Sequence, residues 1–141
     1  MPPRIIKLLH VEDSMVPRRI LARQLAAVKE YSFAITCVAS EDEAVEEFSR
    51  GGFDCVILDY HLAQGDGLSC LRKLRALDSL APIIAASGEA TPEIAAELLR
   101  VGADDYISKA DLQSGAVTRS LCAALARTEA LRQYLPAGSS G

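Results

Sequence analysis

Short, nearly continuous apolar runs alternate with segments of helical periodicity, and this alternation constrains the fold more than any other feature of the sequence. An apolar run without interleaved polar residues favours a strand that is covered on both faces. Helix signals lie between the runs, such as the capping box that starts at Ser40 and the Thr91-Pro92 pair before Glu93. The alternation predicts a doubly wound α/β domain, with a five-stranded parallel sheet and five helices on its two faces. The predicted strands are 5–11, 33–38, 53–58, 82–86 and, more weakly, 105–108.

The composition narrows the class of protein. Half of the 141 residues are apolar, which is enough for one domain with a substantial core. The net charge is −4 and Trp is absent, which disfavours direct contact with nucleic acid, because phosphate contacts need clustered positive charge. No apolar run reaches the ~20 residues that a membrane span needs. The four cysteines form no C-x-x-C pair, so we expect reduced core thiols, including Cys37 and Cys55, in a cytoplasmic protein.

The last predicted helix continues beyond the end of the domain, which we place at residue 127. The last predicted helix carries Val117, Leu121 and Leu125 on one face, and its pattern extends toward Leu135. We assign 1–127 to the domain, and 128–141 to an extension of that helix followed by a flexible tail or linker stub. The basic side chains of the first and third helices, among them Arg18, Lys73 and Arg75, are expected to be solvated helix faces.

Polar residues follow four of the five predicted strands. Glu12 and Asp13 follow the first strand, Asp59 ends the third, Ser87 ends the fourth and Lys109 follows the fifth. In open α/β sheets, ligands bind beyond the carboxyl ends of the strands, so these side chains are expected to meet at one edge. Three converging carboxylates repel one another, and one lysine cannot neutralise them. The pattern therefore predicts a Mg²⁺ site, which Mn²⁺ also suits, beside an aspartate able to accept a phosphoryl group.

At this point the ordered motifs resemble a known family. Together they look like the receiver domain of response regulators in two-component signalling, of the chemotaxis-regulator kind, over roughly residues 4–127. The resemblance implies a flavodoxin-like sheet in the order 2-1-3-4-5. The motifs are Val11-Glu12-Asp13-Ser14, Leu58-Asp59-Tyr60-His61-Leu62 with Gly65-Asp66-Gly67, Ala86-Ser87-Gly88, and Gly102-Ala103-Asp104-Asp105-Tyr106-Ile107-Ser108-Lys109.

The resemblance also implies the chemistry at the strand ends. Asp59 is the implied phosphoacceptor, and its donor is a histidine kinase or a histidine phosphotransfer protein. Asp13 and Glu12 are implied metal ligands together with Asp59, and the main-chain carbonyl of His61 is a further one. Lys109 is implied to contact phosphoryl oxygens as a point charge. Such a domain is not an enzyme with a separate substrate, although it assists its own phosphorylation and dephosphorylation.

A switch follows from the same resemblance. Ser87 is implied to hydrogen-bond the phosphoryl group and to move toward it, while Tyr106 changes rotamer. The surface made by the fourth helix, fifth strand and fifth helix then changes. Its implied partner is a downstream output protein, a covalently linked output domain, or a second copy in a homodimer.

Three positions depart from the family's common pattern, and one of them is Ala63, which replaces the usual proline in the loop after the acceptor. Ala110 follows Lys109, where family members commonly have a proline joined by a cis bond, so either a strained cis bond or a trans bond is expected. Gly88 stands where alanine is common. His61 and Glu89 occupy variable positions that flank the attacking water, and we expect them to set the lifetime of the phosphorylated form.

Two other functions remain open on the sequence. A receiver-like module that binds partners without phosphorylation is one, although every expected site position is filled. A cobalamin-binding α/β module is the other, because Asp59-x-His61-x-x-x-Gly65 superficially matches its signature. The spacing from His61 to Gly65 is one residue longer than usual, and the motif follows the third strand rather than the first.

Overall fold

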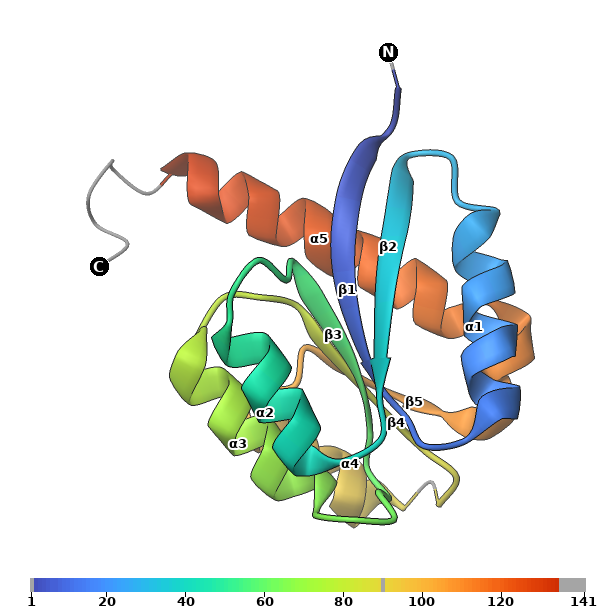
Figure 1. Ribbon diagram of the computed structural model, residues 1–141, viewed down its shortest axis with the longest axis vertical. Coiled ribbons are helices and arrows are strands. Elements are labelled where there is room, and N and C mark those ends of the chain that lie inside the picture. Colours follow the sequence, from blue (N-terminus) through green and yellow to red (C-terminus); the bar gives the residue numbers. More distant parts are fainter. Residues whose placement is uncertain (1, 90, 135–141) are drawn as a thin grey trace.

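Strands and helices alternate through the chain as the sequence predicts (Figure 1). The computed structural model describes residues 2–89 and 91–134. All five strands and all five helices are confirmed, and one short 3₁₀ helix, η1, was not predicted. The elements are β1 (Arg4–Val11), α1 (Met15–Ala26), β2 (Tyr31–Val38), α2 (Glu41–Ser49), β3 (Cys55–Asp59), α3 (Gly67–Leu77), β4 (Ile83–Ser87), α4 (Pro92–Val101), β5 (Asp105–Ser108), η1 (Lys109–Ser114) and α5 (Ala116–Tyr134).

The five strands form one parallel sheet in the order β2-β1-β3-β4-β5, as the resemblance implies. Two apolar cores lie on its two faces. One core packs the sheet against α1 and α5, and the other packs it against α2, α3 and α4 (Figure 1). The reversal of strand order between β1 and β3 places a crevice beyond their carboxyl ends, which is where doubly wound sheets bind ligands.

The prediction that every apolar run is covered on both faces is right for the central strands and wrong at the edges. Every residue of β3 and β4 is buried. β2 is an edge strand whose residues are mostly half-buried or exposed, and Cys37 is exposed rather than a core thiol. Cys55 and Cys70 are buried, as expected. The edge position of β2 follows from the topology, which the residues of the run do not encode.

The last helix, α5, runs without interruption from Ala116 to Tyr134 and extends beyond the sheet (Figure 1). Its buried residues include Val117, Leu121 and Leu125, the three predicted to face the core. Leu135 and the tail assigned to 136–141 lie outside the described residues. In the described part of the chain, no helix combines the length and apolarity that crossing a bilayer requires.

The loop between β3 and α3 is held in a tight conformation. Gly67 donates its N–H to the carbonyl of Tyr60 at 3.2 Å, and a Cβ at Gly67 would lie 2.5 Å from that oxygen. Asp66 caps α3 by accepting from Leu68 N at 3.0 Å. No side chain larger than hydrogen fits at Gly67 unless the backbone shifts, so the glycine fixes the path by which the chain leaves Asp59.

Glu41, the first residue of α2, is a buried carboxylate. It accepts hydrogen bonds from Asp66 N at 2.9 Å and Ser69 Oγ at 2.7 Å, and Lys73 Nζ lies 2.7 Å away. Burial alone would raise the pKa of Glu41, but the hydrogen bonds from Lys73, Ser69 and Asp66 outweigh it and lower the pKa. The charged form is therefore the one that the fold stabilises.

This lowered pKa predicts a pH-dependent contribution to stability. At pH 7, Glu41→Gln is expected to reduce the free energy of unfolding by about 2 kcal/mol, because charged hydrogen bonds are lost. The folded pKa lies below the ordinary value of 4.5, so the deficit is full above that pH and closes as the pH falls through the folded value. Urea unfolding of wild type and Glu41→Gln, from pH 7 to below pH 4.5, measures the difference in the free energy of unfolding. Glu46→Gln, on the exposed side of α2, is the control, and a deficit that does not change with pH would contradict the prediction.

Candidate functional site

Strand periodicity brings three charged side chains to one side of the sheet. Ile57 of β3 and Ile107 of β5 belong to the core under α1 and α5. Asp59 and Lys109 each lie two residues further along the chain, and alternate residues of a strand share a face. Glu12 follows β1 next to Asp59, because Val11 pairs with Leu58, and its N–H bonds to Val38 O at 2.9 Å. The three side chains therefore converge at the carboxyl ends of the strands.

Lys109 bridges two buried carboxylates. Its Nζ lies 2.7 Å from Glu12 Oε1 and 2.9 Å from Asp59 Oδ2. Burial opposes the charge on Lys109, but the hydrogen bonds to Glu12 and Asp59 outweigh this and raise the pKa of the lysine. For Glu12, burial raises the pKa of the carboxyl group, and the hydrogen bond from Lys109 opposes this. Repulsion from Asp59 raises the pKa of Glu12 further. Lys109 is a stable cation whose charge is shared by two acids.

Asp13 adds a third carboxylate to this pair. Glu12, Asp13 and Asp59 each place one oxygen within 4.8 Å of the others, and Asp13 is exposed while the other two are buried. Three carboxylates face one ammonium group, so the cluster keeps an excess of negative charge on oxygen ligands. This donor set fits Mg²⁺, which prefers oxygen and is commonly held by carboxylates, and the exposure of Asp13 leaves the cluster open to solvent.

Main-chain amides hold the two buried carboxylates in place. His61 N donates to Asp59 Oδ1 at 3.1 Å, and Ser14 N donates to Glu12 Oε2 at 3.2 Å. Each carboxylate thus has one oxygen on Lys109 and the other on an amide of the following loop. Arg18 Nε donates to the main-chain carbonyl of Glu12 at 2.6 Å, so Arg18 is not the solvated side chain that the sequence suggested.

Ser87 and Tyr106 meet at one main-chain carbonyl. Ser87 is fully buried, and its Oγ donates to Glu89 O at 3.2 Å while accepting from Glu89 N at 3.0 Å. The hydroxyl of Tyr106 donates to the same oxygen at 3.0 Å. In the described residues no hydrogen bond joins Ser87 to Asp59 or Lys109. The shared carbonyl, which sequence reasoning missed, links the two predicted switch residues directly.

His61 and Glu89 lie near each other at the surface. His61 Nε2 is 3.8 Å from Glu89 Oε2, and the two side chains are 52% and 72% exposed. His61 follows Asp59 by two residues and Glu89 follows Ser87 by two, so the pair spans the loops after β3 and β4. Both side chains therefore lie on the loops that follow the strands ending at Asp59 and Ser87.

The Lys109–Ala110 peptide bond is trans, since the described residues contain no cis bond. Ala110 N instead donates to Ser108 Oγ at 3.2 Å, which starts η1 directly after β5. Of the two geometries left open by the missing proline, the trans one holds. Lys109 reaches both carboxylates from it.

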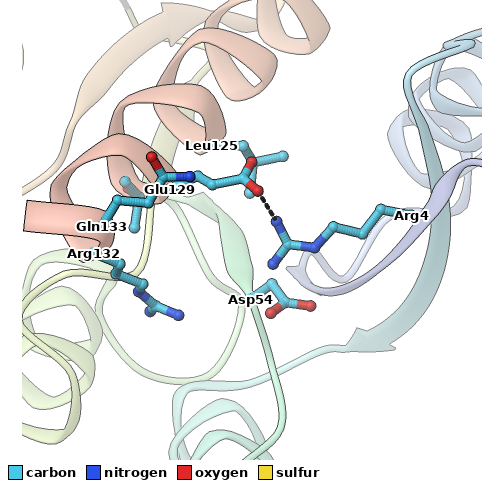
Figure 2. Close-up of a pocket in the computed structure, with 7 residues that line it drawn as sticks. Arg4, Asp54, Leu125, Glu129, Arg132 and Gln133 are labelled. Carbon is cyan, nitrogen blue, oxygen red and sulfur yellow. Dashed lines mark ion pairs between the residues drawn. The ribbon is translucent and has the colours of Figure 1, made fainter. Parts of the chain in front are cut away.

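A shallow pocket of about 270 Å³ lies at the opposite end of the sheet (Figure 2). It sits between the start of β1 and the exposed end of α5, and Arg4 pairs with Glu129 across it at 3.2 Å. Asp54 and Arg132 also line it, so its charges balance (Figure 2). The length of β1 separates this pocket from the cluster of Glu12, Asp13 and Asp59.

Comparisons with known proteins agree with this geometry. A family model described as the response regulator receiver domain matches residues 8–116. The transcriptional regulatory protein ZraR of Escherichia coli is 29% identical over 132 residues, which is 94% of this chain and 29% of that protein. ZraR of Salmonella typhimurium is also 29% identical, over 96% of this chain and 30% of that protein. The chain spans about three tenths of the length of these curated relatives.

Solved structures show the same fold. A response regulator from Burkholderia pseudomallei has a TM-score of 0.72 at 26% identity, covering 90% of this chain and 72% of that one. The receiver domain of a putative LuxO repressor from Vibrio parahaemolyticus has a TM-score of 0.82 at 21% identity, covering 93% and 98%. The match of the family model over most of the chain, together with this architecture, shows that the chain belongs to the response-regulator receiver domain family.

Proposed function

We propose that this receiver domain takes a phosphoryl group on Asp59 from a histidine kinase or histidine phosphotransfer protein, in a Mg²⁺-dependent reaction. One observation carries the proposal: Asp59 is buried at the end of a central strand, 2.9 Å from Lys109 and grouped with two further carboxylates. The similar protein from Burkholderia pseudomallei contains a phosphorylated aspartic acid and a calcium ion in its crystal structure. An equivalent state of this chain would carry its phosphoryl group on Asp59.

The proposed metal ligands are Glu12, Asp13, Asp59 and the main-chain carbonyl of His61. A bound Mg²⁺, or Mn²⁺ in its place, supplies charge neutralisation for the phosphoryl oxygens. The fit rests on the three converging carboxylate oxygens and on the excess negative charge of the cluster. The amides of His61 and Ser14 orient the carboxylates of Asp59 and Glu12 before any ligand arrives.

In phosphoryl transfer, the protein contributes mainly by positioning the reacting groups and by stabilising the charge of the phosphoryl oxygens. A carboxylate oxygen of Asp59 attacks phosphorus, an acyl-phosphate bond forms, and the bond from phosphorus to the donor nitrogen breaks with its electrons going to that nitrogen. Lys109 already touches Asp59, so its ammonium group lies within reach of the oxygens of the transferred group. These residues make the domain a participant in its own phosphorylation.

The new phosphoryl group carries a charge of roughly −1.5 to −2, which replaces the single negative charge of the Asp59 carboxylate at the end of β3, next to the strand that ends at Ser87. We propose that the Ser87 hydroxyl then leaves Glu89 O to donate to a phosphoryl oxygen. Ser87 then no longer holds the main chain of Glu89, so the carbonyl that accepts from the Tyr106 hydroxyl is free to move, and we propose that the Tyr106 side chain changes rotamer with it. The surface of α4, β5 and α5 would thereby signal to an output partner, a linked output domain or a second copy. We propose 1–127 as the signalling domain, with the end of α5 as its connection, acting in the cytoplasm where its free thiols stay reduced.

Incubation with a small acyl phosphate and Mg²⁺ tests this proposal. Intact mass spectrometry is expected to show one phosphoryl adduct, and fragmentation is expected to place it on the peptide containing Asp59. A chelator should abolish the adduct, because the carboxylates then lack their counter-charge. Absence of an adduct under saturating donor and Mg²⁺ would favour a receiver-like module that acts without phosphorylation.

The exposed pair His61 and Glu89 yields a prediction about the phosphorylated form. His61→Ala removes the ring of the residue whose amide binds Asp59, and opening this side of the site is expected to let water reach the acyl phosphate several times faster. Loss of the adduct with time, followed by mass spectrometry after removal of the donor, measures the rate. Arg72→Ala, on the exposed side of α3, is the control. A rate of phosphate loss unchanged by His61→Ala would reject the role of this pair.

A further inference from the structure

The carboxylate of Glu41 collects donors from two segments that follow β3. Its side chain is 9% exposed although it opens α2, where acidic residues are usually solvated. Oε1 accepts from Asp66 N, at the end of the β3–α3 loop, and Oε2 receives Ser69 Oγ and Lys73 Nζ from α3. A carboxylate with this many directed donors holds its neighbours in one geometry.

The same residue packs against the loop. Glu41 N donates to Gln64 O at 3.2 Å, next to an isolated parallel bridge between Ser40 and Gln64. A Cβ on Gly65 would lie 2.5 Å from Glu41 Cβ, and Gly65 has a φ of +104°, a conformation that glycine adopts without strain. Glu41 thus contacts the consecutive residues Gln64, Gly65 and Asp66, and glycine allows the close approach.

The other end of this loop is attached to the phosphorylation site. Asp59 Oδ1 accepts from His61 N at 3.1 Å, and Tyr60 O accepts from Gly67 N at 3.2 Å. The loop 60–66 is therefore fixed at its start by Asp59 and Tyr60 and at its end by Glu41. The main-chain carbonyl of His61, the proposed metal ligand, lies between these two attachments.

We infer that Glu41 is a positioning residue for the metal site, which it serves by holding the loop 60–66 and with it the carbonyl of His61. The inference rests on the proposed function, since it assigns a task within the same site. Glu41 touches neither the metal nor the phosphoryl group. It acts through the loop, as outer groups orient the ligands of other metal sites, where their removal typically weakens metal affinity 10- to 100-fold.

Titration of the full chain with Mg²⁺ in a calorimeter tests the inference. Glu41→Gln keeps the size of the side chain but removes the charge that gathers Ser69 and Lys73, and it is expected to raise the dissociation constant for Mg²⁺ about 10-fold. Ser69→Ala removes one donor and leaves the carboxylate, so a smaller shift in the same direction is expected from a protein that keeps its fold. Glu46→Gln lies on the same helix with an exposed side chain, and it should leave the constant unchanged.

The kinetic readout separates positioning from general loss of structure. With an acyl phosphate donor, Glu41→Gln should need about 10 times more Mg²⁺ for half-maximal phosphorylation, with a maximal rate at saturating Mg²⁺ within about twofold of wild type. Partial unfolding would instead lower the maximal rate and leave the Mg²⁺ requirement of the folded fraction unchanged.

The two proposals fail differently. Equal Mg²⁺ affinities of wild type, Glu41→Gln and Ser69→Ala would overturn the inference, even if Asp59 is phosphorylated normally. A wild-type protein that binds Mg²⁺, with weaker binding in Glu41→Gln, but that accepts no phosphoryl group would overturn the proposed function and leave the positioning role in place. A wild-type protein that binds no Mg²⁺ would overturn the positioning role.

Discussion

Asp59→Asn is expected to abolish the phosphoryl adduct that wild type forms with an acyl phosphate and Mg²⁺. The amide has no anionic oxygen to attack phosphorus, and it also removes one of the three negative charges that the metal would balance. Of the three carboxylates that the described residues bring together, only Asp59 belongs to a strand, at the end of β3, whereas Glu12 and Asp13 follow the end of β1 and Asp13 is exposed. Intact mass spectrometry over the time in which wild type becomes fully labelled measures the loss.

A matched control lies at the other end of the same strand. Asp54 precedes β3 and accepts from Lys7 N at 2.9 Å, far from the carboxyl ends of the strands. Asp54→Asn should therefore be labelled like wild type, although it loses a hydrogen bond. Labelling of Asp59→Asn at the wild-type rate would move the acceptor to another residue, and mapping the labelled peptide would show which.

The convergence of Glu12, Asp59 and Lys109 could be predicted because it depends on little more than strand count and direction. Three parallel strands end at one edge of a sheet, and residues two apart along a strand share a face, so residues at strand ends meet whatever the loops do. The order of the strands came from the resemblance, and the structure confirms it. This is why the convergence of these groups follows from the sequence, while the two ion pairs of Lys109 and the loop amides that bind the carboxylates are seen only in the structure.

Contacts between loops and helices were not predictable in the same way. The helical pattern predicts a solvated side chain at Arg75, but its guanidinium donates to Gly102 O at 2.7 Å, to Ala81 O at 2.6 Å and to the carboxylate of Asp104 at 2.8 Å. Lys73, on the same helix, pairs with Glu41. The partners lie in other segments, Gly102 and Asp104 between α4 and β5 and Glu41 at the start of α2, and a helical pattern indicates which residues face the core but not which exposed positions another segment will cover.

The exposed Cys37 shows the same limit on the strand side. Its run is as apolar as those of the central strands, but β2 has a neighbour on only one side, and its residues are mostly half-buried or exposed. The apolar runs therefore predict where the strands lie, but not how far the side chains of each strand are buried. Depth is set by position in the sheet, a property of the whole chain.

Lys109→Met is expected to lose both stability and phosphorylation. Met keeps most of the length of the side chain but leaves Glu12 and Asp59 buried without their shared cation. Breaking a buried ion pair by removing one partner typically costs about 3 kcal/mol or more, because the remaining charge is neither paired nor hydrated. Urea unfolding at pH 7 in the presence of a chelator should show a loss of this size. Adding Mg²⁺ should restore part of it, because a dication offsets the same carboxylates.

The rate of labelling by acyl phosphate should fall about 10²-fold in Lys109→Met even at saturating Mg²⁺, since a fixed cation beside developing phosphoryl charge is worth this much in comparable sites. Lys109→Arg separates the effect of charge from the effect of shape. It keeps the cation, so it should recover most of the free energy of unfolding. The labelling rate should recover less, because a planar guanidinium does not reproduce a point charge held between two carboxylates 2.7 and 2.9 Å away. If Lys109→Met were as stable as wild type in chelator, the lysine would not be balancing buried charge, and the cluster would have to be neutral in the metal-free protein. That result would also remove the reason for a dication at this edge of the sheet, because both the lysine and the metal are inferred from the negative charge of ionised carboxylates.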